Sequence, residues 1–214
     1  NRCWRRCGAG RERTRGPSGE PPRTNPGSRD PVALSDASLE PLLRLSLVPG
    51  VGPQRLALLL RRYGSAESVL RASARELGLL PGMGPGVAAR IQRHAGPVGA
   101  RLARRAIERV RRGGAVAITA DDPDYPDTFR VVTEPPYLLF AAGDLRHLQL
   151  PTVAVVGTRT PTRYGRDAAA RFGAGLARYG YAVVSGMARG IDSAAHHAAL
   201  GAGGVTIGVL GHGI

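Results

Sequence analysis

Hydrophobic and polar positions divide the chain into three stretches. Before residue 32 aliphatic side chains are almost absent, and Arg, Gly, Pro, Ser and Thr make up most of the sequence. Between residues 32 and 114, Leu, Val and Ala recur every three or four positions, which is the period of an amphipathic helix. Beyond residue 114, short apolar runs alternate with helical stretches. We therefore expect a disordered arm over residues 1–31, a helical domain over residues 32–114 and an α/β domain over residues 115–214.

The helical domain contains the same turn twice. The segments 48–53 and 80–85 share the order apolar residue, Pro, Gly, apolar residue, Gly, Pro, and apolar residues at helical spacing follow both. Glycine permits a tight turn, proline suits a helix start, and free N–H groups there attract anions. The pair resembles a tandem helix-hairpin-helix of the SAM-like type, which binds DNA phosphates without reading sequence. Its candidate contacts are Gly50, Gly52, Gly82 and Gly84. An αα-corner that only packs is the alternative.

Two further helices are expected beside the repeated turns. Ser35 is placed to cap a helix whose apolar face carries Leu39, Leu42, Leu43 and Leu45. A second helix, Arg101 to Arg112, has an apolar face built on Ala103, Ala106, Ile107 and Val110, and arginines elsewhere. Those arginines are either a solvated helix face or a contact for DNA.

The last three apolar runs predict a parallel sheet. Five runs are expected to be strands: 116–119, 137–140, 153–156, 181–184 and 205–210. Helical stretches at 165–179 and 193–200 separate the last three, and alternating strands and helices form parallel sheets with right-handed crossovers. The expected fold is a Rossmann-like doubly wound sheet, preceded by the small helical domain. Its ligand should lie beyond the carboxyl ends of the strands.

Charge is concentrated in the N-terminal half. The net charge is +14, and all 30 basic residues are Arg. Residues 1–31 carry 8 Arg and 3 acidic residues, residues 32–114 carry 14 and 5, and residues 115–214 carry 8 of each. A basic half without counter-charge favours a polyanion, usually nucleic acid. A GC-rich genome explains the preference for Arg over Lys, but not the missing acidic residues.

Glycine-rich loops follow the last three strands. Glycine lets a ligand approach backbone N–H groups, and the arginine fork holds phosphate. Because two of the loops also carry Arg, they suit a phosphate-bearing ligand. The candidate contacts are Gly157, Thr158, Arg159, Ser185, Gly186, Arg189, Gly190, Asp192, His196 and Gly213.

Asp192 and His196 lie four residues apart at a predicted helix start, on one face. In the simpler interpretation, Asp192 caps the helix and His196 is bonded nearby. In the other, both side chains shape the ligand pocket. A third role for Asp192 is to orient the neighbouring Arg189.

Several kinds of site lack their required residues. The dinucleotide signature Gly-x-Gly-x-x-Gly is absent after Val156, and Ser185 stands where an acidic residue would hold a ribose. A Walker A loop needs Lys, and Ser185 lacks the preceding glycine of a nucleophile elbow. Cys3 and Cys7, the only cysteines, suffice for neither a disulfide framework nor a zinc site. We therefore expect no catalytic residue, metal or cofactor, no membrane span and a cytoplasmic location.

Ordered motifs across residues 121–213 resemble those of the DprA/Smf family of DNA-processing proteins. The most specific is Ser185-Gly186-Met187-Ala188-Arg189-Gly190-Ile191-Asp192 with Ala195-His196, although Leu is commoner than Met at its third position. The others are Asp124-Tyr125-Pro126-Asp127, Pro135 to Gly143, Val155 to Arg159 with Tyr164-Gly165, Ala199-Leu200, and Thr206 to Gly211.

The resemblance implies a non-catalytic protein that binds single-stranded DNA and loads RecA recombinase onto it during natural transformation. It places Gly157, Thr158 and Arg159 in a positively charged pocket. It also implies a homodimer whose contact surface, with further sheet and pocket residues, lies beyond Ile214. Two alternatives stay open. One is an enzyme, a nucleoside monophosphate phosphoribohydrolase that uses the same loops. The other is a structural module that binds DNA through the paired hairpins alone.

Overall fold

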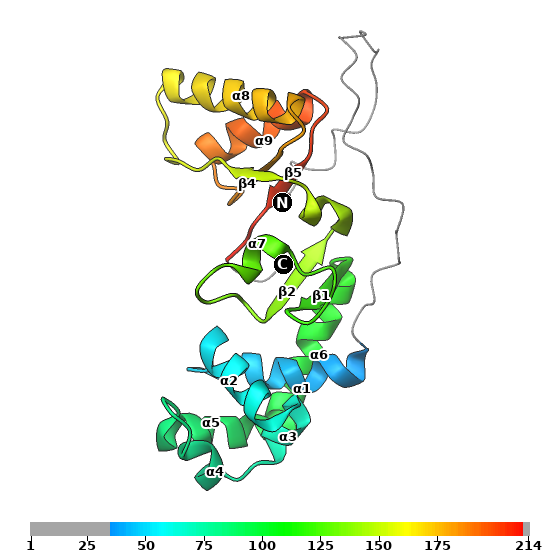
Figure 1. Cartoon of the computed structure of the whole chain (residues 1–214), viewed down its shortest axis with the longest axis vertical. Coiled ribbons are helices and arrows are strands. Elements are labelled where there is room, and N and C mark those ends of the chain that lie inside the picture. Colours follow the sequence, from blue (N-terminus) through cyan, green and yellow to red (C-terminus); the bar gives the residue numbers. More distant parts are fainter. Residues whose placement is uncertain (1–34, 212–214) are drawn as a thin grey trace.

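The structure is a computed structural model that describes residues 35–211 (Figure 1). The expected arm over residues 1–31 and the candidate contact Gly213 lie outside this range. The helical part comprises α1 (Asp36–Ser46), α2 (Pro53–Tyr63), α3 (Ala66–Arg71), α4 (Ala74–Gly78), α5 (Gly84–Ala95) and α6 (Pro97–Arg112). It is followed by β1 (Ala115–Thr119), α7 (Asp127–Arg130), β2 (Leu138–Ala142), the 3-10 helix η2 (Leu145–Gln149), β3 (Thr152–Ala154), α8 (Arg163–Arg178), β4 (Ala182–Ser185), α9 (Ile191–Gly201) and β5 (Thr206–Gly208).

Serine caps begin three of the N-terminal helices. The predicted cap Ser35 accepts the Ser38 N–H at 3.4 Å and starts α1. The short helices α3 and α4 were not predicted individually, although Ser65 and Ser73 cap them. Ser73 and Glu76 form a reciprocal capping box, in which the Glu76 carboxylate accepts the Ser73 N–H at 2.7 Å. These helices surround a core of fully buried side chains that includes Leu45, Leu59, Val69, Leu77 and Ile91.

The two predicted turns precede α2 and α5, and each places a proline in the first helical turn. Gly50, Gly82 and Gly84 have φ values of 92°, 72° and 53°, a region that favours glycine. Gly52 differs, since its φ is −84° and an added Cβ would meet no atom within 4 Å. A conformational need for glycine therefore holds at Gly50, Gly82 and Gly84 but not at Gly52.

The first two strands form a sheet of their own. β1 and β2 pair antiparallel, with Ala117 opposite Phe140. The buried side of this pair packs on α1 and α6, where Ala117 joins Leu39, Leu43 and Ile107 in one hydrophobic cluster. The sheet therefore lies against the helical part (Figure 1).

The last three strands form the predicted parallel sheet, in the order β3-β4-β5. Both crossovers run in the same direction along the sheet, and right-handed connections then place both helices on one face. There α8 and α9 pack on a core of Val183, Ala195 and Ala199. This confirms the Rossmann-like class after a helical domain.

Two of the parallel strands are shorter than predicted. β3 ends at Ala154, and Val156 is 71% exposed. Within the described residues β3 pairs with β4 alone, so few contacts extend it before the chain turns into the following loop. β5 likewise covers only residues 206–208 of the predicted 205–210.

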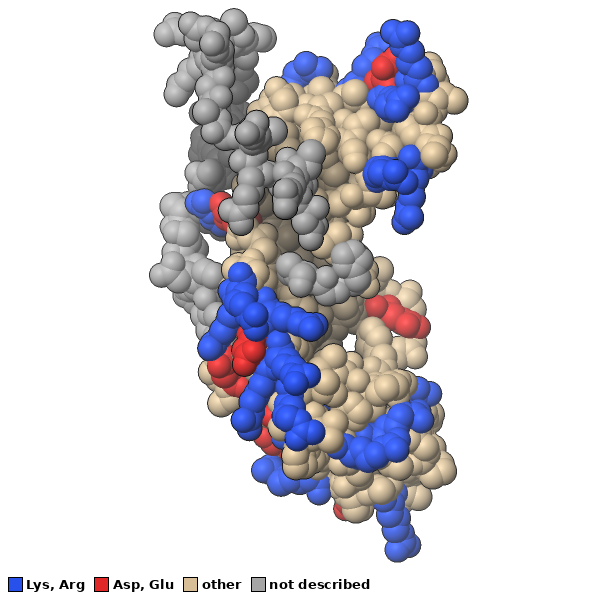
Figure 2. Space-filling model, turned by 180° about the vertical axis from the view of Figure 1, so that it is seen from behind, with Lys and Arg blue, Asp and Glu red and all other residues tan. Residues whose placement is uncertain are grey.

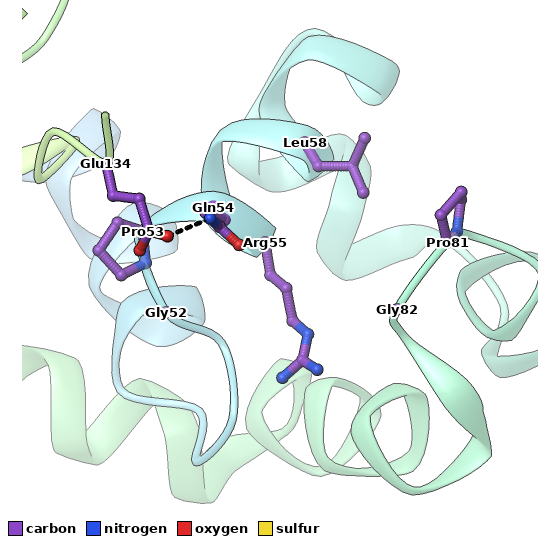
Figure 3. A pocket seen from close by; sticks show the side chains of 8 residues that line it. All are labelled: Gly52, Pro53, Gln54, Arg55, Leu58, Pro81, Gly82 and Glu134. Atoms are coloured by element: carbon purple, nitrogen blue, oxygen red, sulfur yellow. Dashed lines mark hydrogen bonds between the residues drawn. The ribbon is translucent and has the colours of Figure 1, made fainter. Parts of the chain in front are cut away.

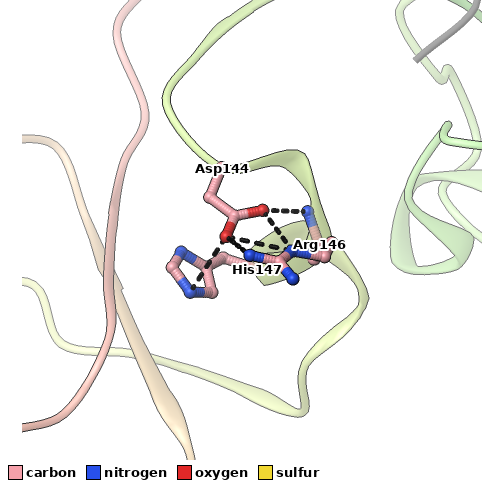
Figure 4. Close-up of polar contacts among 3 residues, drawn as sticks. All are labelled: Asp144, Arg146 and His147. Carbon is pink, nitrogen blue, oxygen red and sulfur yellow. Dashed lines mark hydrogen bonds and ion pairs between the residues drawn. The ribbon is translucent and has the colours of Figure 1, made fainter. Parts of the chain in front are cut away.

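A charged turn joins the two sheets (Figure 4). The Asp144 carboxylate accepts the Arg146 backbone N–H at 3.0 Å and the Arg146 guanidinium at 2.6 Å, which fixes the start of η2. The hydrogen bonds from the Arg146 side chain, more than any other effect, lower the pKa of Asp144 to about 2.

Candidate nucleic-acid interface

The loops after β3 and β4 touch one another. The Ile191 N–H donates to the Thr158 carbonyl at 3.2 Å. Gly190 has a φ of 93°, and a Cβ there would overlap the Thr158 carbonyl oxygen. A Cβ on Gly157 would lie 2.6 Å from Cγ1 of Ile191. Close packing of the two loops therefore requires glycine at both positions, independently of any ligand.

The start of α9 differs from the sequence prediction. Asp192 does not cap this helix, because Gly190 occupies the cap position and Asp192 lies inside the first turn. The helix begins earlier than expected because Ile191 bonds to the neighbouring loop. The buried Asp192 carboxylate instead accepts the Ala188 N–H at 3.3 Å, and the Ser193 hydroxyl donates to the Ala188 carbonyl at 2.7 Å. These bonds hold the loop onto its own helix.

Two arginines of these loops are exposed and free of carboxylates. Arg159 and Arg189 are both exposed, as are Gly157, Thr158 and Gly186. Among the ion pairs between described residues none involves either arginine, and Asp192 does not pair with Arg189. The loop edge thus carries two guanidinium groups available to an external anion.

Ser185 and His196 lie beneath this edge. Ser185 is 2% exposed, and its hydroxyl donates to the Val155 carbonyl at 2.6 Å, which joins two strands. His196 is 5% exposed, and neither ring nitrogen has a hydrogen-bond partner among the described residues. Burial lowers the pKa of His196, and the nearby Asp192 carboxylate only partly opposes this shift. Both side chains therefore support the loops from below and do not face solvent.

Two arginines that sequence reasoning did not single out meet at the first hairpin. The Arg90 Nε of α5 donates to the Pro49 carbonyl at 2.7 Å, and Arg55 of α2 donates to the Gly50 carbonyl. A Cβ on Gly50 would lie 3.1 Å from one Arg90 nitrogen and 3.7 Å from one Arg55 nitrogen. Since 35 residues separate Arg55 from Arg90, no local pattern brings them together.

The helix α6 carries the densest group of exposed arginines. The rear view shows cationic side chains gathered over this helix and others at the opposite end of the molecule (Figure 2). Arg111 pairs with Asp36 at 2.6 Å and Arg112 with Glu108 at 3.2 Å. The other exposed arginines of α6, which have no ion pair to a described residue, are Arg101, Arg104, Arg105 and Arg109.

Met187 is a further residue of this edge that the sequence reasoning passed over. It has a φ of 58°, unusual for a residue with a side chain, and its sulfur packs over Gly208 of β5. Its departure from the commoner Leu was visible in the sequence, but its backbone conformation was not. The third loop begins beside it, where the Val209 N–H donates to the Ser185 carbonyl at 2.9 Å.

Residues 35–211 contain no group of three or more His, Cys, Asp or Glu side chains placed to hold a metal ion. None of the helices in that range combines the length and the apolar character needed to cross a membrane.

Two family models match the sequence. The model described as DNA recombination-mediator protein A matches residues 116–214, and the SAM-like helix-hairpin-helix tandem matches residues 42–96. Protein Smf of Synechocystis is 34% identical over 179 residues, which cover 80% of this chain and 44% of that protein. A putative DNA processing protein DprA of Mycobacterium tuberculosis is 40% identical over 180 residues, covering 74% of this chain and 42% of that protein.

A solved structure agrees with this similarity. The X-ray structure of DNA processing protein A from Streptococcus pneumoniae superposes with a TM-score of 0.60 at 26% identity. The match covers 84% of this chain and 59% of that one. The chain spans less than half the length of the Synechocystis and Mycobacterium tuberculosis relatives.

Proposed function

The chain belongs to the DprA/Smf family of DNA-processing proteins, and on that premise we propose that it binds single-stranded DNA at the loops after β3 and β4. The observation that carries the proposal is the exposed edge at the carboxyl ends of the parallel strands, where Arg159 and Arg189 pair with no carboxylate among residues 35–211. Open α/β sheets bind ligands at this edge.

The proposed contact is to the phosphate backbone. Arg159 follows β3, and Thr162 caps α8 just beyond it, so the positive end of that helix dipole lies in the same loop. Two free guanidinium groups hold phosphates in planar, bidentate geometry. Gly157 and Gly190 keep the two loops in contact and thereby set the distance between the arginines.

The biological role that fits such binding is DNA processing during transformation. We propose that the protein coats incoming single strands and assists the loading of a RecA recombinase, as a homodimer of the whole protein. The role requires binding without a chemical step. The Ser185 hydroxyl of the β4 loop motif is buried and already donates to the Val155 carbonyl.

The test is a binding titration with a short oligothymidine at fixed salt. Arg159→Ala should weaken binding about tenfold to a hundredfold, because a bidentate arginine–phosphate contact is lost. Arg159→Lys should restore part of the affinity, since Lys keeps the charge but not the fork.

Arg105→Ala on the exposed α6 helix is the matched control and should cost less, since its charge is screened and has close substitutes. Equal losses for the two alanine variants would favour the second candidate, binding through the helical domain alone. Release of free base from nucleoside monophosphates, abolished by Arg159→Ala, would favour the phosphoribohydrolase alternative.

A further inference from the structure

A pocket of about 420 Å³ lies between the two hairpins, a size that suits one small ligand (Figure 3). Pro53 lies at one end with Gln54 and Glu134, and Leu58 and Pro81 lie at the other. The aliphatic side chains of Pro53, Leu58 and Pro81 offer surfaces against which a flat ring can pack.

The pocket carries opposite charges at separate places. Near its Pro53 end, the Gln54 amide donates to the Glu134 carboxylate, which comes from the segment after α7. Arg55 extends across the middle of the pocket away from Glu134 (Figure 3). Its guanidinium lies beside that of Arg90 at Gly50, and neither arginine pairs with a carboxylate among the described residues. Two adjacent cations of this kind are stabilised by an anion.

These features together select a class of ligand. A free phosphate would meet the arginines but would leave Glu134 without a donor from the ligand. A ligand with an anion at one end and a hydrogen-bond donor at the other satisfies both groups. An unpaired nucleotide has this form, because cytosine, adenine and guanine carry an amino group from which a carboxylate accepts a hydrogen bond. A base inside a duplex is stacked and paired, so it cannot enter a pocket of this size.

We propose that the pocket between the hairpins holds one unpaired nucleotide of single-stranded DNA, with an amino-bearing base at Glu134 and its phosphate at Arg55 and Arg90. The proposal rests on the proposed binding of single-stranded DNA and adds a second contact in the helical domain. It also assigns the hairpins a base preference, whereas phosphate contacts alone carry none.

The test compares oligodeoxycytidine and oligodeoxythymidine, which are both pyrimidine strands; cytosine carries an amino group at C4, whereas thymine carries a carbonyl oxygen there and a methyl group at C5. The full chain is titrated with each oligonucleotide at fixed salt and pH 8, and the ratio of the two affinities is measured. The wild-type chain should bind oligodeoxycytidine about three- to tenfold more tightly, the size expected for the net contribution of one hydrogen bond at an exposed site. Glu134→Ala should bring the ratio to about one.

Glu108→Ala removes the same charge from the exposed face of α6 and should leave the ratio unchanged. Arg159→Ala should weaken the binding of both oligonucleotides by the same factor. Because Glu134 is exposed, its replacement is compatible with folding, and circular dichroism checks this. A wild-type ratio of one, or a ratio that Glu134→Ala does not change, overturns the pocket proposal. If the wild-type chain still prefers oligodeoxycytidine but Arg159→Ala leaves both affinities unchanged, only the proposed site at the parallel sheet is overturned.

Discussion

At the scale of the residue, glycines of the candidate interface serve contacts within the protein. The sequence suggested that glycine lets a ligand approach the backbone. In the structure Gly157 faces Ile191 and Gly190 faces Thr158, with no room for a side chain at either. The loops can meet a phosphate only in the positions that this mutual packing sets.

We expect Gly190→Ala to lower the free energy of unfolding by about 1–3 kcal/mol, because it combines a strained backbone conformation with a steric overlap. Thermal denaturation measures the loss. Gly175→Ala is the matched control, since Gly175 lies inside α8 with open space around its Cα. That change should stabilise by about 0.5–1 kcal/mol. Equal stability of the two variants would contradict the packing argument.

His196 predicts a dependence of stability on pH. Its pKa is lower in the folded protein than in the unfolded chain, so the unfolded chain binds the proton more readily. The free energy of unfolding is therefore highest above about pH 6.5, where His196 is neutral in both states. It decreases as the pH falls below that value, because the unfolded chain takes up the proton first.

His196→Leu should therefore flatten the fall in melting temperature between about pH 7 and pH 5. The exposed His197, whose ring nitrogen bonds the Ser193 carbonyl at 2.7 Å, is the control. His197→Gln should leave the wild-type profile in place. If both variants keep the same slope, His196 is not the group responsible.

At the scale of the element, the two hairpins share a sequence pattern but not one set of constraints. Gly50 combines a φ of 92° with close contact to two arginines, whereas Gly52 has ordinary backbone geometry and open space. The bonds from Arg55 and Arg90 to the first hairpin also connect it to both α2 and α5. The first hairpin is therefore held by arginine side chains of two helices, whereas the second depends on two glycines at positive φ.

Gly50→Ala should cost about 1–2 kcal/mol of stability, the usual penalty for a left-handed residue with a side chain. Gly52→Ala should cost less, about 0.5–1 kcal/mol, because Gly52 is the N-cap of α2 and Gly is preferred to Ala there, but the change introduces no backbone strain. Urea denaturation of both variants distinguishes these outcomes. A larger loss for Gly52→Ala would mean that the turn conformations are assigned to the wrong positions.

At the scale of the whole molecule, positive charge occupies surfaces far apart in the sequence. The α6 arginines form one group, and the loop arginines of the parallel sheet form another. Binding of single strands weakens with salt in proportion to the number of phosphates neutralised, with a slope of about −0.7 for each. The slope therefore measures how many phosphates of the strand the basic side chains neutralise.

Replacing Arg101, Arg104, Arg105 and Arg109 together by Gln should leave the salt slope nearly unchanged if the strand contacts only the loops and hairpins. That is our expectation, and titrations from low to moderate salt measure it. Arg159→Ala should reduce the slope by about 0.7. A reduction of about 2 or more for the quadruple variant would instead make α6 a principal contact.

Local sequence patterns were enough to identify the classes of structure and the places of the loops. The change from helical periodicity to apolar runs separated by helices predicted the parallel sheet, because period and topology follow from local sequence. The repeated turn marked the hairpins, and the ordered motifs indicated the family. The arginines of the loops were also found in this way, since loops that follow apolar runs can be recognised in the chain even where the last residue of the strand cannot.

Which of the candidate residues face solvent became clear from the three-dimensional packing alone. Ser185 and His196 stand in the same motif as Arg189, yet they are buried while Arg189 is exposed. Burial depends on which elements pack above a residue, and that depends on contacts between distant segments. The same reason holds for the pocket between the hairpins. Glu134 reaches it from 80 residues beyond Gln54, a separation across which local sequence carries no information.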